Sequence, residues 1–188
     1  PIYRFSYQSQ TLGLLLTTIG GPATVGILEE VWVKGAEKVL LFGTCGGLDA
    51  DLPAGHFIVP TAAYRDEGTS FHYLPPSDYV EIPTACRLAE CFDALDLPYV
   101  QGKTWTTDAI YRETPDLIRR RRQEGCVTVE MEAAAFFAVS KYYDIPLAQL
   151  LYAGDDVSGE AWDARGWDRQ KNVRANLIQT ALDLIRDF

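Results

Sequence analysis

The sequence predicts a single α/β domain whose central sheet, mostly parallel or mixed, is covered by helices on both faces. Apolar runs of strand length alternate with amphipathic stretches of helix length along the chain. Such alternation favours a parallel sheet between two helical layers. The 188 residues lie in the usual size range for one domain, and the sequence contains no repeat, linker or low-complexity tract. We therefore expect residues 1–188 to form one unit.

Six strands and five helices are expected. The strands are short apolar or β-branched runs, and the first two, TLGLLLTT and EKVLLFG, read as buried. In chain order the strands cover residues 11–18, 37–43, 56–64, 99–106, 126–130 and 146–153. Among the helices, Gly35 is placed to end the first, and Pro115 lies in the first turn of the third. The helices cover residues 23–34, 83–95, 115–124, 131–143 and 168–186.

The acidic balance of the chain restricts its partners. The net charge is −9, from 26 acidic and 17 basic residues. An acidic surface repels phosphate backbones, so no nucleic-acid partner is expected. The run from Arg119 to Arg122 is the exception. A solvated helix face explains this run better than a nucleic-acid patch, because Glu124 follows it and no aromatic residues are interleaved.

The sequence gives no sign of a membrane or of secretion. No apolar stretch approaches the roughly 18 residues of a membrane span, and there is no leader of the secretory kind. We therefore expect a cytoplasmic protein without a membrane partner. The chain begins at Pro1 and its only methionine is Met131, which indicates a processed or shortened chain. Because C-x-x-C spacing is absent, we expect no metal site and four reduced thiols, at Cys45, Cys86, Cys91 and Cys126.

Three loops are candidates for a ligand site. In sheets of this kind, ligands bind beyond the carboxyl ends of the strands. This rule selects residues 20–22, 44–47 and 154–159, which are also the segments richest in glycine and hydroxyl groups. Small residues and free backbone N–H groups let a chain approach an anion or a sugar closely. Taken alone, residues 44–47 are better explained as an ordinary tight turn, and the Gly20–Gly21 pair as an ordinary start of a helix.

Carboxylates follow the last two predicted strands. Glu130 and Glu132 lie on one side of the chain, at the start of a helix rich in alanine and phenylalanine. A glutamate in a first turn commonly complements the helix dipole, which accounts for one of them. A second one entering an apolar helix needs partners, and sugar hydroxyls would supply them. Asp155 and Asp156 end an apolar run, where an α/β enzyme would place its acid, although aspartate also forms turns.

Taken together, these segments resemble the nucleoside phosphorylase family, which includes uridine phosphorylases, bacterial purine nucleoside phosphorylases and related nucleosidases. The most specific element is VEMEAAA at residues 129–135, followed by Asp155. Supporting matches are IGGP at 19–22, GTCGG at 43–47, TTDAIY at 106–111 and DRQ at 168–170. The resemblance covers nearly the whole chain and implies the three-layer α/β fold of these phosphorylases.

The resemblance also implies a role for each matched residue. It implies that Met131 and Glu132 hold the ribose, that Asp155 is the acid at the base, and that Arg169 places this acid. The implied phosphate ligands are Thr44, Gly20 and an Arg4 lent to a neighbouring subunit, and the implied base contacts are Ile110, Tyr111, Cys45 and Gly46. As an N-glycosidic bond breaks, positive charge develops on the sugar and negative charge on the base. Separate carboxyl groups would then meet the two charges.

Two departures from the family pattern leave three functions open. The family's usual amino-terminal strand and phosphate loop have no counterpart, and Leu41 stands where its phosphorylases carry a phosphate-binding arginine. The first interpretation is a nucleoside phosphorylase with inorganic phosphate as co-substrate and no other cofactor. The second is a nucleosidase that uses water, and the third is a catalytically silent nucleoside-binding or assembly subunit.

Base preference and assembly follow from the same resemblance. Residues 112–115 are Arg-Glu-Thr-Pro, without the glutamine-and-arginine pair that uridine phosphorylases place there to read uracil. A purine nucleoside, cleaved to free base and ribose 1-phosphate, is therefore the favoured substrate. An Arg4 that acts across an interface implies a homo-oligomer, from a dimer to a hexamer.

Overall fold

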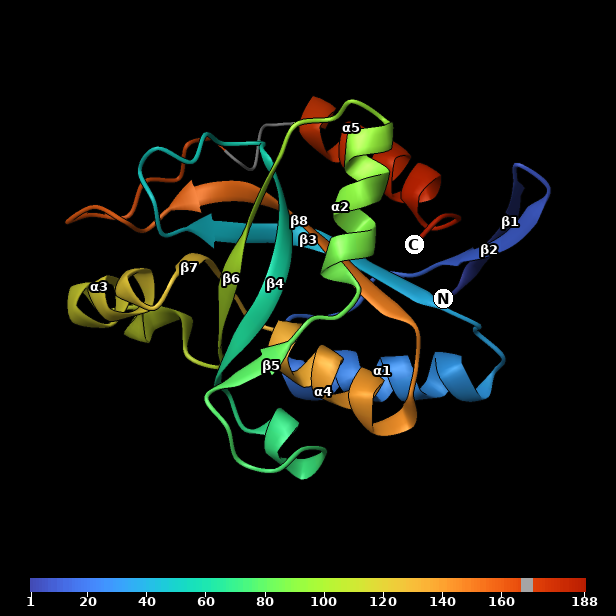
Figure 1. Cartoon of the computed structure of the whole chain (residues 1–188), viewed down its shortest axis with the longest axis horizontal. Helices are drawn as coiled ribbons and strands as arrows, with labels where there is room; N and C mark the ends of the chain where they lie inside the picture. Colours follow the sequence, from blue (N-terminus) through green and yellow to red (C-terminus); the bar gives the residue numbers. More distant parts are fainter. Residues whose placement is uncertain (167–170) are drawn as a thin grey trace.

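The computed structural model describes residues 1–166 and 171–188 of the chain. In these ranges it contains a six-stranded mixed sheet, a separate two-stranded hairpin and five α-helices (Figure 1). The strands are β1 (Tyr3–Tyr7), β2 (Gln10–Leu14), β3 (Val39–Gly47), β4 (Phe57–Asp66), β5 (Tyr79–Glu81), β6 (Tyr99–Thr107), β7 (Cys126–Glu130) and β8 (Leu147–Asp156). The helices are α1 (Gly21–Val33), α2 (Ala85–Ala94), α3 (Pro115–Gln123), α4 (Ala133–Tyr143) and α5 (Lys171–Leu184), with short 3-10 helices η1 (Thr69–His72) and η2 (Ile110–Arg112).

The six-stranded sheet closes on itself. Its strand order is β5-β4-β6-β7-β3-β8, and β8 pairs in addition with β4. The pairs β4–β6, β6–β7 and β3–β8 are parallel, whereas β3–β7, β4–β8 and β4–β5 are antiparallel. The predicted α/β fold class with a mixed sheet is therefore confirmed. The closure was not predicted, because periodicity indicates which runs are strands but not which strands pair.

Helices pack on both sides of this sheet. In the view of Figure 1, α1 and α4 lie below it, α2 and α5 lie above it, and α3 lies at its left end. One apolar cluster joins α1, α2, α4 and α5 to β4 and β8. Helix α4 contributes an unbroken buried run to it, from Ala133 to Val139. A Cβ added at Gly21 would lie 3.0 Å from the Cβ of Ala135. The first turn of α1 therefore lies directly against α4.

The prediction of a buried strand at residues 11–18 is wrong. Residues 10–14 form β2, which pairs with β1 in an antiparallel hairpin outside the main sheet. Beyond the hairpin, the Leu16 side chain is 93% exposed. The hairpin leaves the body on the side opposite the carboxyl ends of β3 and β8 (Figure 1). An apolar run alone cannot distinguish a strand of the core from one that projects from it.

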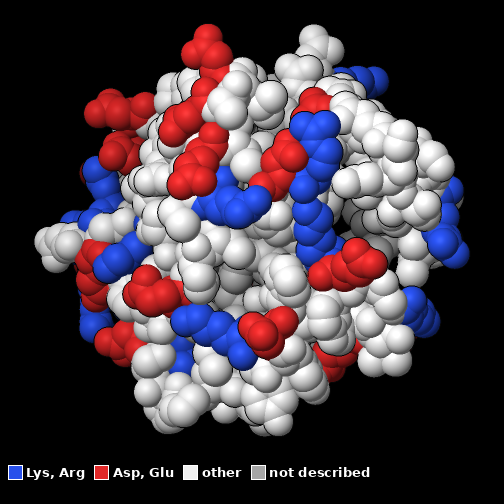
Figure 2. All heavy atoms as spheres, turned by 45° about the vertical axis from the view of Figure 1, so that its right-hand side comes forward, with Lys and Arg blue, Asp and Glu red and all other residues white. Residues whose placement is uncertain are grey.

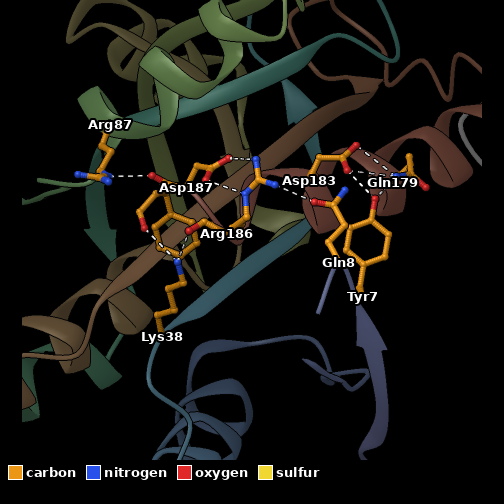
Figure 3. A network of polar contacts seen from close by, with 9 residues as sticks. Tyr7, Gln8, Lys38, Arg87, Gln179, Asp183, Arg186 and Asp187 are labelled. Atoms are coloured by element: carbon orange, nitrogen blue, oxygen red, sulfur yellow. Dashed lines mark hydrogen bonds and ion pairs between the residues drawn. The ribbon is translucent and has the colours of Figure 1, made fainter. Parts of the chain in front are cut away.

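Polar contacts fix the turn of this hairpin to the carboxyl-terminal residues (Figure 3). The Tyr7 hydroxyl donates a hydrogen bond to the Asp183 carboxylate at 2.6 Å, and Arg186 donates to the Gln8 side chain at 2.8 Å. Exposed contacts of this kind each stabilise a fold only slightly. Together they fix the direction in which β1, with Arg4, leaves the body of the protein.

The surface carries mixed charge. On the face shown in Figure 2, acidic and basic side chains are interspersed. In the Arg119 to Arg122 run, the prediction of a solvated face is wrong for Arg121, which is 2% exposed, whereas its three neighbours are exposed. The Arg121 guanidinium lies 3.3 Å from the centroid of the Tyr64 ring and 2.5 Å from the Glu124 carboxylate. Within the described ranges, no helix is both long and apolar enough to cross a membrane.

The contact between β6 and β7 yields a stability prediction. A Cβ at Gly102 of β6 would lie 2.5 Å and 2.7 Å from the two γ-carbons of Val127 on β7. Because valine is stiff at χ1, we expect Gly102→Ala to lower the free energy of unfolding by about 1–3 kcal/mol. Gly26→Ala is the matched control, since a Cβ there meets nothing within 4 Å and α1 favours alanine over glycine. Urea unfolding of both variants checks this, and equal midpoints would contradict it.

Candidate functional site

The carboxyl-terminal residues of four strands lie together where the end of β3 pairs antiparallel with the end of β7. Gly47 of β3 lies opposite Asp156 of β8, and Thr106 of β6 lies opposite Glu130 of β7. The two halves are joined by the pairing of β3 with β7 at Gly46. The last residues of β3, β7 and β8 are therefore neighbours, and carboxyl ends of strands are where α/β sheets bind ligands.

Glu130 is a buried carboxylate that caps α4. Its Oε2 accepts hydrogen bonds from the backbone N–H groups of Glu132 at 2.8 Å and Ala133 at 2.7 Å. Its Oε1 accepts a hydrogen bond from the Thr106 hydroxyl at 2.6 Å, and the same hydroxyl oxygen accepts one from the Ala134 N–H at 2.9 Å. Burial, and then the charge of Glu132, raise the pKa of Glu130 to about 7. Glu130 therefore fixes the start of α4 rather than facing a ligand.

Glu132 joins the starts of α4 and α1. Its Oε1 accepts a hydrogen bond from the Gly20 backbone N–H at 2.6 Å. Gly20 has a φ of 103°, a backbone conformation that favours glycine. The Glu132 carboxylate is half-buried, and burial raises its pKa. Two residues from the implied ribose and phosphate positions are thus in direct contact.

Asp155, in β8, points into the space beside residues 44–47, which were predicted as a turn but form the end of β3. A Cβ added at Gly46 would lie 3.6 Å from Asp155 Oδ1 and 3.0 Å from a γ-carbon of Val129. The other carboxylate oxygen, Oδ2, accepts a hydrogen bond from the Trp162 indole N–H at 2.5 Å. The glycine at position 46 therefore leaves the Asp155 carboxylate open to a bound molecule.

Asp156, the neighbouring carboxylate, holds the loop after β8. It forms an ion pair with Arg165 and accepts a hydrogen bond from the Ser158 N–H at 2.8 Å. Arg165 also donates to the Leu52 carbonyl at 2.6 Å. Hydrogen bonding to Ser158 and the charge of Arg165 outweigh burial, the largest single influence, and lower the pKa of Asp156. Asp156 therefore has the turn-forming role that is common for aspartate, and Asp155 remains the candidate for contact with a ligand.

Sequence reasoning missed two residues near Asp155. Trp162 lies in the loop after β8 and donates its indole hydrogen to this carboxylate. Glu113 directly follows η2 and is half-buried, and burial together with the charge of Asp155 raises its pKa to about 7. The available signal was the position of Glu113 just after the TTDAIY match.

Thr44 and Cys45, both on β3, differ in how accessible their side chains are. Thr44 is exposed at the end of β3, so its hydroxyl is available to an anion. Cys45 is buried and its thiol donates to the Tyr152 carbonyl at 3.3 Å. Burial, then the charges of Glu130 and Asp155, raise the pKa of the Cys45 thiol.

Other candidates lie at the edge of the site or beyond it. Met131 is half-buried beside Glu132. Ile110 and Tyr111 on η2 are 52% and 96% exposed, and Arg4 is exposed on the projecting hairpin. Arg169 lies outside the described residues. Across residues 1–166 and 171–188, no group of three or more His, Cys, Asp and Glu side chains is arranged to hold a metal ion.

Comparison with known proteins identifies the family. A family model described as the phosphorylase superfamily matches residues 1–188. The chain belongs to the phosphorylase superfamily. A guanosine phosphorylase of Halorubrum lacusprofundi is 33% identical over 143 residues, which are 74% of this chain and 59% of that protein. A DeoD-type purine nucleoside phosphorylase of Bacillus cereus is 24% identical over 183 residues, 95% of this chain and 77% of that protein.

Two solved structures share the fold of this chain. A purine nucleoside phosphorylase from Toxoplasma gondii, in complex with immucillin-H, superposes with a TM-score of 0.83 at 23% identity, over 97% of this chain and 76% of that one. An AMP nucleosidase from Bacteroides thetaiotaomicron superposes with a TM-score of 0.77 at 21% identity. The match covers 98% of this chain and 74% of that one. This chain spans about three-fifths of the length of the haloarchaeal guanosine phosphorylase (59%).

Proposed function

We propose that this superfamily member cleaves the N-glycosidic bond of a purine nucleoside by phosphorolysis, to give the free base and ribose 1-phosphate. One observation carries the proposal: two separate carboxylates lie where the ends of β7 and β8 adjoin the glycine-rich end of β3, Glu132 at the start of α4 and Asp155 near the end of β8. The names of relatives support phosphorolysis and a purine base. Guanosine is accordingly the first substrate to test.

The two carboxylates serve opposite ends of the breaking bond. Positive charge develops on the ribose, and the Glu132 carboxylate would stabilise it while accepting hydrogen bonds from ribose hydroxyls. Met131, beside it, would pack against the sugar. Asp155 would lie at the departing base, in the space that Gly46 leaves open.

Phosphate would bind at the exposed Thr44 hydroxyl as a co-substrate, and no other cofactor is required. Arg4 projects from the body on the hairpin, away from this chain's own strand ends (Figure 1). We therefore assign Arg4 to the phosphate site of a neighbouring copy, which makes the working unit a homo-oligomer. Arginine suits this role because its planar fork binds phosphate through two hydrogen bonds.

Hydrolysis is the second candidate, and two observations favour it. Leu41, at the position of the expected arginine, packs against the apolar core and brings no cation. The Gly20 N–H, a phosphate ligand by resemblance, already donates to Glu132. With both groups unavailable to phosphate, water could take its place as the nucleophile.

The deciding experiment measures release of free base from guanosine, inosine, adenosine and uridine, with and without inorganic phosphate. We expect phosphate-dependent release from guanosine, with ribose 1-phosphate as the second product. Asp155→Asn should abolish most of it. Asp116→Asn is the matched control, because Asp116 is an exposed carboxylate at the start of α3.

Each result selects one function. Release without phosphate, with free ribose as product, would establish a nucleosidase. If no nucleoside is cleaved but calorimetry detects guanosine binding, the chain is a silent nucleoside-binding subunit. Equal activity of wild type and Asp155→Asn would remove Asp155 from the mechanism.

A further inference from the structure

Trp162 is a large aromatic residue with little burial beside the candidate site. It lies in the loop after β8, and 64% of the residue is exposed. A tryptophan that serves the core buries most of its ring, which is the source of its large contribution to stability. The single donor of this side chain, its indole N–H, instead donates to Asp155 Oδ2 at 2.5 Å. The contact that distinguishes Trp162 is therefore one with a proposed catalytic group.

The loop that carries Trp162 is held by other groups. Asp156 and Asp163 exchange two backbone hydrogen bonds, at 2.8 and 3.0 Å, which close the loop. The Asp156 carboxylate also forms an ion pair with Arg165, on the far side of the loop. Because Trp162 directly precedes Asp163, these contacts fix the backbone next to it. The indole is therefore not needed to hold the loop.

The two carboxylate oxygens of Asp155 have different surroundings. Rotation of an aspartate carboxylate about χ2 is soft, so a hydrogen bond is needed to fix it. Oδ2 accepts that hydrogen bond from the Trp162 indole. Oδ1 lies 3.6 Å from the position that a Cβ on Gly46 would occupy, so it borders the space that the absent side chain leaves open. Trp162 thus determines which of the two oxygens faces a bound molecule.

We propose that Trp162 is a positioning residue of the base subsite and acts through Asp155. Its indole holds Oδ2, so that Oδ1 meets the departing purine at a fixed distance and angle. The inference rests on the proposed function, which places Asp155 at the base. Catalytic groups contribute most when their geometry is fixed before the reaction, and a displacement of about 1 Å can cost roughly 10²-fold in rate. The directed hydrogen bond from the indole supplies that constraint.

The first test compares Trp162→Phe with the wild type, and Trp32→Phe is the matched control. Phenylalanine keeps an aromatic ring but has no N–H group. We expect Trp162→Phe to lower kcat for guanosine by roughly 10–10²-fold and to leave KM nearly unchanged. Trp32 packs on the core in the last turn of α1, so its replacement should not change kcat. Full guanosine activity of Trp162→Phe would overturn the proposal.

A double-mutant cycle shows whether Trp162 acts through Asp155. In an Asp155→Ala background the indole has no carboxylate to hold, so adding Trp162→Phe should cost no further activity. A further loss as large as that in the wild-type background would overturn the proposal, because the ring would then act without Asp155. If Asp155→Ala is as active as the wild type, the role of Asp155 in the proposed function fails, and this inference fails with it.

A second substrate separates positioning from folding. p-Nitrophenyl β-D-riboside has a leaving group that departs as a stable anion without help from Asp155, so Trp162→Phe should cleave it as fast as the wild type does. Equal losses on guanosine and on this substrate would make Trp162 structural and overturn the proposal. If the wild type cleaves neither substrate, the proposed function itself fails. If the wild type and Trp162→Phe cleave guanosine equally well, the proposed function stands and only this inference fails.

Discussion

Replacing Glu132 by glutamine is expected to lower kcat/KM for the nucleoside by roughly 10²–10³-fold, the cost of removing one preorganised group that meets transition-state charge. The carboxylate is held by the 2.6 Å hydrogen bond from Gly20, so it needs no reorganisation as charge develops on the ribose. Glutamine keeps the size and the acceptor oxygen but not the charge. The loss should therefore appear mainly in kcat. Steady-state kinetics with saturating phosphate measure it.

Two further variants sharpen this prediction. Glu132→Asp keeps the charge but shortens the side chain by one methylene, so its loss should lie between those of the wild type and the glutamine variant. Glu90→Gln on α2 is the matched control, since it removes an exposed carboxylate away from the site and should leave kinetics unchanged. A glutamine variant at position 132 with only a raised KM would show that the charge acts in binding and not in the chemical step.

The strands and helices of the core were predictable because their patterns are strong. The strand at residues 126–130 matches β7, and the α4 run of alanine and phenylalanine is buried as its composition indicates. The prediction of a buried strand at residues 11–18 failed because the hydrophobic pattern does not identify the partner strand, and β2 pairs with β1 alone. The closure of the sheet through the pairing of β4 with β8 could not be predicted for the same reason.

The residues of the candidate site likewise include some that the sequence predicts and some that it does not. Glu132 and Asp155 could be proposed because they end strand patterns, and strand ends meet at one edge of a sheet. Trp162 lies in a loop whose path depends on tertiary contacts, so no pattern placed it beside Asp155. Glu130 shows that sequence cannot assign different roles to two nearby glutamates. Sequence could say that one of two glutamates serves the helix start, but only the hydrogen bonds to Ala133 and Thr106 identify which one.

Glu130→Ala is expected to lower the free energy of unfolding by about 2–5 kcal/mol, because it leaves buried donors without an acceptor. The N–H groups of Glu132 and Ala133 and the Thr106 hydroxyl all donate to this one carboxylate. The start of α4 would also lose the group that holds Glu132 in place, so activity should fall as well. Urea unfolding monitored by circular dichroism measures the first effect.

Glu130→Gln is the matched control, and it adds a dependence on pH. Burial first, and then Glu132, raise the Glu130 pKa to about 7, above the value of an exposed glutamate. Proton binding then favours the folded state, so this stabilisation is complete at low pH and is lost as pH rises through about 7. Glutamine cannot ionise. The stability of Glu130→Gln relative to the wild type should therefore increase from about pH 5 to about pH 8. A constant difference across that range would mean that Glu130 stays ionised in the folded protein, with its three donors outweighing burial.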